Sequence, residues 1–447
     1  MRRAFYQRVL KENVNVEDNS QKFQSDAEIR GFLHELFNTA IAAADPVRCL
    51  PDYLPEPPAG RTIVVGAGKA ASKMLACIES RWQGELEGLV IVPYGYGQKC
   101  EGVRIIEAGH PIPDLAGNIA SKQILELVTG AGGCDLVIFL ISGGASSLLS
   151  LPLSGLTADD KAQVHSKLLK SGADITEINC VRKHLSAVKG GRLAMAAAPA
   201  RVVTFLVSDV PGDDPSVIGS GPTIANTSSC HDAAKILAKY DINEPEVAIK
   251  MLEEGKVPAP SPTASIFTDQ SYQVIASPQL ALEAAANLAK KRGIEPLILG
   301  DSIEGEAKEV AKAMAGIAQQ VRNYSQPLFP PAVLLSGGET TVTVNGKGVG
   351  GRNSEFQLAL ALKLRGAKGI FSLAADTDGI DGNGENAGAF ITPDTLKNAT
   401  LKSIDALDYL RQNNSAVFFQ KLNDLFITGP THTNVNDFRA ILILPQY

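Results

Sequence analysis

A glycine turn that presents a lysine follows the first predicted strand. The turn is Gly66–Ala71, with the letters GAGKAA, and it lies between the apolar segment 62–65 and a helical pattern. It matches the relaxed dinucleotide-binding fingerprint, but Pro93 and Tyr94 stand where the acidic residue for the ribose is expected. No hydroxyl residue follows Lys69, so a P-loop is also incomplete. A lysine at a helix N-terminus favours an anion, which makes Lys69 a candidate ligand of phosphate or carboxylate. A surface lysine on a glycine-rich connector is the alternative.

A basic segment, Asn179–Arg192, stands out in a chain whose net charge is −6. If residues 179–188 are helical, Arg182, Ser186 and Lys189 fall near one face of that helix. Such a face is suited to an anionic substrate. A solvated basic helix is the alternative.

Two acidic loops follow predicted strands. Asp209 comes directly after the strand 202–207, and Asp378 lies in the loop 376–386 after the strand 370–374. Carboxylates at strand ends are suited to Mg²⁺, which takes one or two of them together with phosphate oxygens. The second loop superficially resembles an EF-hand, but no helical pattern precedes it, so we reject calcium sensing. Turn chemistry alone remains the alternative for both loops.

Two segments in different halves of the chain are similar. Ser142-Gly143-Gly144 and Ser336-Gly337-Gly338 each end an apolar strand and are followed by hydroxyl residues. Loops at the carboxyl ends of parallel strands build ligand sites, because backbone N–H groups and helix N-termini converge there. We therefore expect the two turns to face each other across a cleft, with two unrelated tight turns as the alternative.

A glycine-rich loop, Gly346–Arg352, precedes another helical pattern. Its backbone can approach phosphates closely, and Arg352 can supply a bidentate charge to a transferred phosphoryl group. A flexible hairpin tip is the alternative. The turn Gly109–Asp114 has a structural interpretation, with Asp114 capping the next helix.

The elements that position these residues are short apolar runs alternating with helical patterns. Continuous apolar runs indicate strands covered on both faces, and the alternation indicates βαβ units in a parallel sheet. The fold class is therefore predicted to be α/β and doubly wound. The runs are 62–65, 89–92, 136–141, 202–207, 333–335 and 370–374.

The chain is long enough for two domains, since single cores mostly stop growing near ~250–300 residues. Pro258, Pro260 and Pro262 occupy alternate positions and favour an extended connector. We therefore predict one doubly wound α/β domain over 1–262 and a second α/β domain over 263–447. A new βα pattern begins at 272–276, and the active site is expected in the cleft between the domains.

Composition narrows the class of protein. Hydrophobic residues make up 45% and charged residues 20% of the chain, as in packed globular proteins. Because the net charge is negative, the protein as a whole does not attract nucleic acid or an anionic membrane. Signal-peptide and membrane-span patterns are absent, and six cysteines without a CxxC pair favour reduced thiols. We expect a soluble cytoplasmic protein.

The ordered combination of these motifs resembles class II glycerate kinases, in which a Rossmann-like region is followed by a region called MOFRL. The matching pieces run in the same order from the first glycine turn to the C-terminal segment: 66–71, 109–114, 142–148, 179–194, 208–223, 336–341, 350–356, 377–382 and 428–437.

The resemblance implies phosphorylation of D-glycerate to 2-phospho-D-glycerate, with ATP and Mg²⁺. It implies catalysis by Lys69, Asp209 and Arg352, and Asp209 and Asp378 as metal ligands. The residues expected to bind substrate are Ser142, Gly143, Gly144, Ser146, Arg182 and Lys189. The residues expected to bind nucleotide are Gly66, Gly68, Gly337, Gly338, Glu339, Gly350, Gly351 and Asn353.

Other functions stay open at this point. Some relatives are called hydroxypyruvate reductase, so an NAD(P)-dependent reductase is the second hypothesis, and a non-catalytic protein that binds nucleotide or glycerate is the third. Asp376 stands where the family has a small residue and His432 where it has glycine. The expected partners are small molecules, with neither nucleic acid nor membrane, and a homodimer is compatible with the resemblance.

Overall fold

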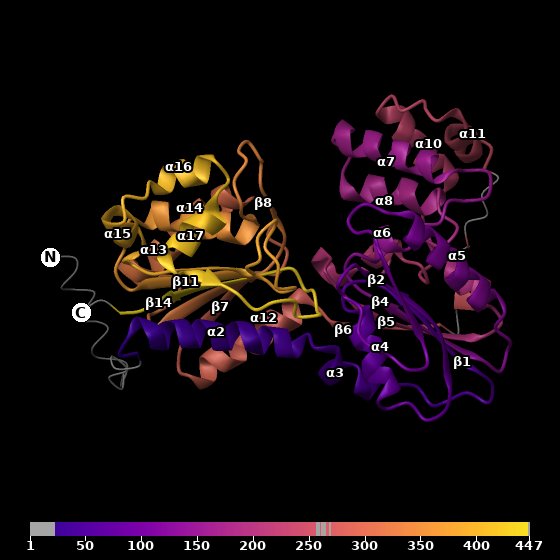
Figure 1. Ribbon diagram of the computed structural model, residues 1–447, viewed down its shortest axis with the longest axis horizontal. Helices are drawn as coiled ribbons and strands as arrows, with labels where there is room; N and C mark the ends of the chain where they lie inside the picture. The colour runs from indigo at the N-terminus through magenta and orange to yellow at the C-terminus, as the bar shows by residue number, and fades with distance from the viewer. Residues whose placement is uncertain (1–22, 256–259, 261–264, 268–269, 446–447) are drawn as a thin grey trace.

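The computed structural model describes residues 23–255, 260, 265–267 and 270–445. Figure 1 shows two α/β bodies side by side, each built around a six-stranded sheet. The predicted boundary at residue 262 lies outside the described residues. No helix in the described part of the chain combines the length and apolar character needed to cross a membrane.

The first sheet is entirely parallel, with the strand order β3-β2-β1-β4-β5-β6. This order is that of doubly wound α/β sheets. Every residue of β1 and β4 is buried, as expected for strands covered on both faces. The strands are β1 (Thr62–Ala67), β2 (Leu86–Pro93), β3 (Arg104–Ala108), β4 (Leu136–Ile141), β5 (Arg201–Val207) and β6 (Ser271–Ala276).

Helices around the first sheet include a separate upper group, visible above α6 in Figure 1, with its own apolar cluster. Asp114 caps α5 as predicted, accepting a hydrogen bond from the Gly117 amide at 2.9 Å. The helices are α3 (Pro46–Cys49), α4 (Ala71–Glu79), α5 (Leu115–Thr129), α6 (Ala145–Leu148), α7 (Ala158–Ser171), α8 (Ile175–His184), α9 (Arg192–Ala197), α10 (Cys230–Lys239) and α11 (Glu246–Glu253). Short 3-10 turns are η1 (Pro51–Tyr53), η2 (Pro211–Asp213), η3 (Ile218–Ser220) and η4 (Ser265–Phe267).

The second sheet is mixed, with the order β13-β12-β11-β14-β9-β7. Only β7 and β9 pair in parallel, and β14 runs antiparallel to both of its neighbours. The strands are β7 (Glu295–Gly300), β9 (Ala332–Ser336), β11 (Ile370–Asp376), β12 (Gly388–Ile391), β13 (Leu425–Phe426) and β14 (Asp437–Ile443), and a separate ladder joins β8 (Gly305–Glu306) to β10 (Thr340–Thr341).

Two helical layers cover the second sheet (Figure 1). One layer holds α13 (Ala307–Tyr324), α14 (Arg352–Leu364), α15 (Thr395–Leu401), α16 (Ala406–Arg411) and α17 (Ser415–Leu422). The opposite face carries α2 (Asp26–Ala43) and α12 (Pro278–Lys291), which pack against each other.

The chain crosses between the bodies in two places that the sequence analysis did not anticipate. Helix α2 precedes the whole first sheet but packs on β14 and β11 of the second sheet, because its apolar face, with Phe37, meets Phe426 and Phe438. Strand β6 follows the proline-rich stretch but hydrogen bonds to β5 on the edge of the first sheet. Proline spacing marks a connector and carries no information about which edge the next strand joins.

Candidate active site

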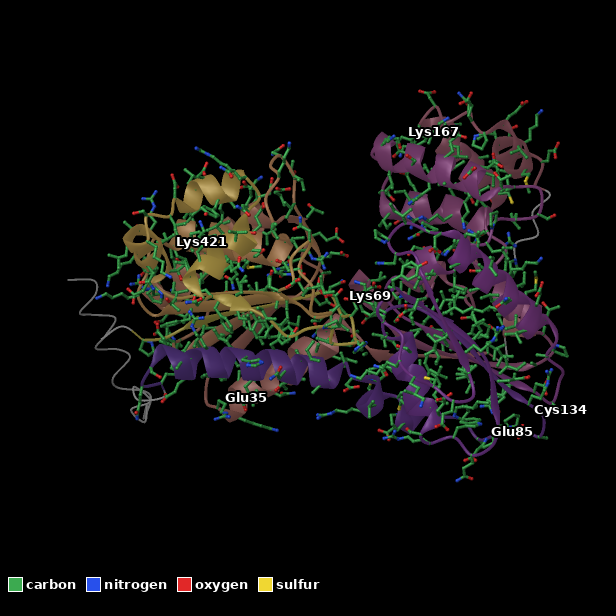
Figure 2. The ribbon with its side chains drawn as sticks, viewed as in Figure 1. Glu35, Lys69, Glu85, Cys134, Lys167 and Lys421 are labelled. Atoms are coloured by element: carbon green, nitrogen blue, oxygen red, sulfur yellow. The ribbon has the colours of Figure 1, made fainter. Side chains whose placement is uncertain are left out.

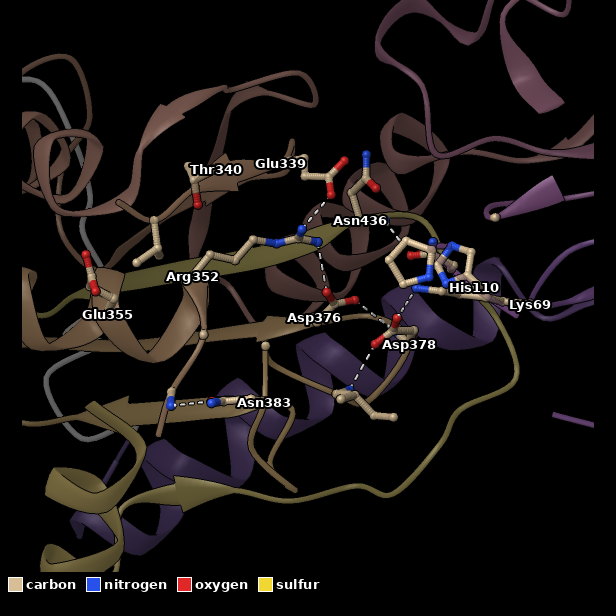
Figure 3. A pocket seen from close by; sticks show the side chains of 18 of the residues that line it. Lys69, His110, Glu339, Thr340, Arg352, Glu355, Asp376, Asp378, Asn383 and Asn436 are labelled. Carbon is tan, nitrogen blue, oxygen red and sulfur yellow. Dashed lines mark hydrogen bonds and ion pairs between the residues drawn. The ribbon is translucent and has the colours of Figure 1, made fainter. Parts of the chain in front are cut away.

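A cavity of about 860 Å³ lies where the two bodies meet. Its walls come from the carboxyl ends of β1, β5 and β11, from the turn after β4, and from the start of α14. Figure 2 shows Lys69 at this junction, and Figure 3 shows the side chains that converge on it. The volume is that of a small-molecule site.

An ion pair joins the two bodies inside the cavity. The Nζ atom of Lys69, after β1, lies 2.5 Å from Oδ2 of Asp378, after β11. Their side chains are 18% and 5% exposed. Burial on its own lowers the pKa of Lys69, but the carboxylates of Asp378 and Asp376 outweigh it and raise that pKa, so the lysine stays charged.

The backbone of the lysine turn is already occupied by protein. The Lys69 amide donates to the Gly143 carbonyl at 2.9 Å, and the Ala70 amide donates to Ser142 Oγ at 3.0 Å. Gly68 has a φ of +132°, and a Cβ there would lie 2.1 Å from Ser142 Oγ. The loop after β4 therefore fills the place that a pyrophosphate takes in dinucleotide-binding turns, and only the Lys69 side chain reaches the cavity.

Arg352 is held by three carboxylates at the start of α14. Its guanidinium lies 2.5 Å from Glu339, 2.8 Å from Asp376 and 2.7 Å from Asp437. Burial favours the neutral form, but Asp437, Asp376 and Glu339 together raise the pKa of Arg352. Figure 3 shows the planar group fixed between Glu339 and Asp376. A guanidinium held in this way keeps one orientation toward the cavity.

Asp376, the first departure from the family pattern, is a partner of Arg352 rather than a disturbance. Its side chain is buried, and its pKa is raised first by burial and second by the Asp378 carboxylate. His432, the second departure, has a φ of +56°, a backbone conformation that favours glycine. The histidine adopts the conformation that a glycine would take there.

The cavity wall carries more carboxylates than cations. Its acidic side chains are Asp209, Glu339, Glu355, Asp376 and Asp378, against the cations Lys69 and Arg352. His110 adds no charge near neutral pH, because burial, assisted by Lys69, lowers its pKa to about 4. A polyanion entering this cavity therefore requires additional positive charge.

Asp209 is the acidic side chain of this wall that stands after β5. No ion pair among the described residues involves it, and its main-chain oxygen accepts a hydrogen bond from Asn436 at 2.6 Å. A Cβ on Gly143 would lie 2.4 Å from Asp209 Oδ2 and 2.5 Å from Asn434 Nδ2, so glycine is required for this approach. Burial first, and Glu339 second, raise the pKa of Asp209 to about 6.

A complete protein cage for a metal is absent from the part of the chain that the structure describes, since no three His, Cys, Asp or Glu side chains are grouped to hold an ion. Mg²⁺ does not require such a cage, because it commonly keeps water and phosphate oxygens as ligands. Asp209 has an unpaired carboxylate on the cavity wall and fits this role. Asp378 is already paired with Lys69.

The sequence-predicted residues divide into those on the cavity wall and those behind it. The wall holds Lys69, Gly144, Asp209, Glu339, Gly350, Gly351, Arg352 and Asp378. Residues behind the wall support it: Ser142 is fully buried, Asn353 donates to Asp437 at 2.7 Å, and the Gly337 amide donates to the Gly300 carbonyl. Gly66, Gly68, Gly143 and Gly338 allow close packing of backbone or side chains, with contacts under 3 Å for an added Cβ. The hydroxyls of the two Ser-Gly-Gly turns are thus buried in the supporting structure.

The helix considered over residues 179–188 has other bounds in the structure. Helix α8 spans Ile175–His184, because Asp174 and Glu177 form a capping box at its start. Ser186 then pairs with Pro152 in an isolated bridge, and Lys189 lies in the connection before α9. Arg182, Lys189 and Ser146 do not line the main cavity but gather in a second place.

Several cavity residues were not predicted from the sequence. Asn413, Asn434 and Asn436 come from irregular segments whose only signal is their asparagine content. Glu355 lies on α14, 1% exposed, where Oε2 accepts a hydrogen bond from Asn413 at 3.0 Å. Its other oxygen has no hydrogen-bond partner among the described residues. A polar residue on a helix gives no sign in the sequence that it faces a cavity.

Comparisons with known proteins identify the family. Residues 32–253 match a domain of unknown function, DUF4147, and residues 332–437 match the MOFRL family. A protein from Agrobacterium vitis called a putative hydroxypyruvate reductase is 48% identical, over 94% of this chain and 95% of its own. D-glycerate 2-kinase from Thermotoga maritima is 40% identical, over 92% and 97%. A crystal structure of glycerate kinase from Thermotoga maritima superposes with a TM-score of 0.85 at 38% identity, covering 94% of this chain and all of the other. The chain therefore belongs to the family of glycerate kinases with a MOFRL region.

Proposed function

We propose that this protein transfers the γ-phosphoryl group of ATP to the 2-hydroxyl of D-glycerate, giving 2-phospho-D-glycerate. The observation that carries the proposal is the convergence of Lys69 and Arg352, from different bodies, on one cavity that also holds Asp209. Phosphoryl transfer asks mainly for positioning and charge stabilisation, which two fixed cations supply. The glycerate kinase names of the relatives agree with this chemistry.

Each of these three residues has a distinct role in the proposal. Arg352, with its fork held by carboxylates, neutralises charge that develops on the transferred group. Lys69, on the side of the first body, stabilises the negative charge that develops on the oxygen of the reacting hydroxyl. Asp209, whose pKa is raised to about 6, accepts the proton of the attacking hydroxyl or helps to hold Mg²⁺.

Mg²⁺ is part of the proposal because five carboxylates and two cations line the cavity. The ion would neutralise phosphate charge, with Asp209 as its first protein ligand. Asp378 becomes available only if Lys69 releases it to contact substrate. We place the triphosphate at Gly350, Gly351 and Glu339, next to Arg352, and glycerate on the side of Lys69 and Gly144.

An NAD(P)-dependent hydroxypyruvate reductase is the second candidate, because a relative at 48% identity carries that name. The glycine turn argues against it. The amides of Lys69 and Ala70 are bonded to Gly143 and Ser142, so they are not available to a dinucleotide. We expect no measurable NAD(P)H affinity.

One assay series tests the proposal. Purified protein is given ATP, Mg²⁺ and D-glycerate while ADP release is followed, and in parallel NADPH or NADH with hydroxypyruvate while absorbance at the nicotinamide band is followed. Proton-coupled ³¹P NMR then identifies the product, since phosphate on C2 couples to one proton and phosphate on C3 to two. Nicotinamide oxidation without ADP release would establish the reductase, and a C3 product would refute the 2-kinase assignment.

A further inference from the structure

Basic side chains gather on the first body beside the turn 143–146, which contains the cavity residue Gly144. Lys161 lies on α7, Arg182 on α8, and Lys189 in the connection before α9. Lys189 Nζ donates to the Ser146 carbonyl at 2.8 Å, and Lys161 Nζ donates to Ser150 Oγ at 3.3 Å. Arg182 lies 2.7 Å from Nε2 of His165, which is also on α7. We call Lys161, Arg182 and Lys189 the basic cluster.

None of the ion pairs in the described part of the chain includes a member of this cluster. Its hydrogen-bond partners among the described residues are hydroxyls, carbonyls, an asparagine amide oxygen and a histidine ring, all without negative charge. Lys189 is 1% exposed and still has no carboxylate to pair with. A buried cation is normally paired, so this arrangement lacks its counter-ion.

The three cations are close enough to disturb one another. Burial first, and Arg182 second, lower the pKa of Lys161 to about 8. Burial, Lys161 and Arg182 lower the pKa of Lys189. Like charges held together in a poorly solvated place destabilise the protein unless an anion joins them. Binding an anion at the cluster would therefore reduce the repulsion between its like charges and stabilise the protein.

The position of the cluster relates it to the reacting centre. Ser146, whose carbonyl holds Lys189, stands on α6 two residues after the cavity residue Gly144. Its hydroxyl lies 2.8 Å from that of Ser220. The same short turn contains Gly143, which lies against Asp209. One turn of backbone thus connects the candidate base to the basic cluster.

We propose that Lys161, Arg182 and Lys189 form an oxyanion site that receives the carboxylate of the 2-hydroxy acid substrate. The inference rests on the proposed function and assigns Lys161, which the sequence did not single out. In a 2-hydroxy acid the carboxylate is attached to the carbon that bears the reacting hydroxyl. A carboxylate site must therefore lie close to the group that accepts the hydroxyl proton, and the turn 143–146 contacts both Asp209 and Lys189. A substrate must therefore carry a carboxylate in order to bind at this cluster.

The test compares Lys161→Met with Lys170→Met in the full-length protein. Both changes remove a lysine from α7, but Lys170 is exposed and outside the cluster. Loss of one charge-assisted contact raises the KM for D-glycerate by about 10-fold or more in Lys161→Met, with the KM for ATP unchanged. Lys170→Met keeps both values. Arg182→Gln, at a half-buried position, is the second variant and behaves as Lys161→Met.

Thermal melting separates binding from folding and from turnover. D-glycerate raises the melting temperature of wild type and of Lys170→Met but not of Lys161→Met, while glycerol, which lacks the carboxylate, raises none at equal millimolar concentration. If wild type shows no kinase activity but this pattern holds, the site stands and the proposed function fails. An unchanged glycerate KM in both cluster variants overturns the site. The carboxylate site is also overturned if Lys161→Met loses only the stabilisation by inorganic phosphate and keeps the stabilisation by D-glycerate. That result would assign the cluster to phosphate.

Discussion

The cavity wall and the basic cluster differ in the groups that surround their buried cations. On the cavity wall, Arg352 has three carboxylate partners and Lys69 has one at contact distance. In the cluster, Lys189 is more deeply buried than either, and its hydrogen bonds go to neutral oxygens. A cation held by carboxylates has a fixed position and a compensated charge, whereas a buried cation without them is stabilised by an anion from outside.

The elements explain part of this difference. Four of the five acidic side chains of the wall lie at or after the ends of β5, β9 and β11, where loops from two bodies meet, and the fifth, Glu355, lies on α14. The basic side chains come from helices α7 and α8 and the connection after them, all within the first body. The charges of the cavity wall therefore come from both bodies, whereas the charges of the basic cluster come from the first body alone.

The largest expected effect comes from breaking the pair that crosses between the bodies. Lys69→Ala leaves Asp378 without its ion-pair partner and removes a charge from the reacting centre, whereas Asp376 keeps Arg352. We expect kcat to fall by about 10²-fold or more, which is typical for one electrostatic donor. Lys73→Ala is the control, because Lys73 lies on the adjoining α4 and pairs with Asp45 outside the cavity. Equal activity of the two variants would limit Lys69 to a structural role in its ion pair with Asp378.

A smaller effect is expected when the charge of Arg352 is kept but its planar fork is lost. Arg352→Lys cannot hold Glu339, Asp376 and Asp437 together, so its ammonium takes no single orientation. We expect kcat to fall by roughly 10- to 100-fold with little change in the KM for glycerate. Steady-state kinetics decide it. A raised glycerate KM with intact kcat would show that Arg352 binds the substrate carboxylate, and the two half-sites would have to be exchanged.

Stability within the cavity wall should depend on which carboxylate is removed. Asp437 is fully buried between Arg352 and Arg439, so Asp437→Asn should cost roughly 3 kcal/mol or more. Glu339 is 55% exposed, so Glu339→Gln should change stability by less than about 1 kcal/mol. Urea unfolding of both variants measures the comparison. Equal losses would mean that burial does not distinguish these partners of Arg352.

The smallest predicted effect concerns pH. Because the pKa of Asp209 is raised to about 6 in the folded protein, its ionisation opposes folding as pH rises from about 4 to 6, and the penalty is constant above that. Asp209→Asn removes this penalty, so its stability relative to wild type should be roughly 1 kcal/mol greater at pH 8 than at pH 5. Unfolding is followed in EDTA to exclude metal binding. A constant difference across this range would contradict the raised pKa.

Much of the local structure was predictable because its causes are local. Continuous apolar runs predicted β4 and the cores of β1, β5 and β11, since strands covered on both faces need no polar alternation. Asp114 was predicted as a cap from its position before an apolar helical pattern. The same kind of reasoning fails at α8, because the capping box of Asp174 and Glu177 starts the helix at Ile175, four residues before the segment 179–188 that the basic residues indicate.

The sequence by itself determined the α/β class, the family, and the positions of the loops that carry Lys69, Asp209 and Arg352. Only the tertiary structure decided which of these side chains meet. Pairing of Lys69 with Asp378 joins residues 309 positions apart, and the partners of Arg352 come from β11, β14 and the turn after β9. Periodicity reports burial along one element, whereas an ion pair depends on how separate elements pack, and that packing is set by contacts distant in sequence. For the same reason the missing counter-ion of Lys161, Arg182 and Lys189 became visible only in the folded chain.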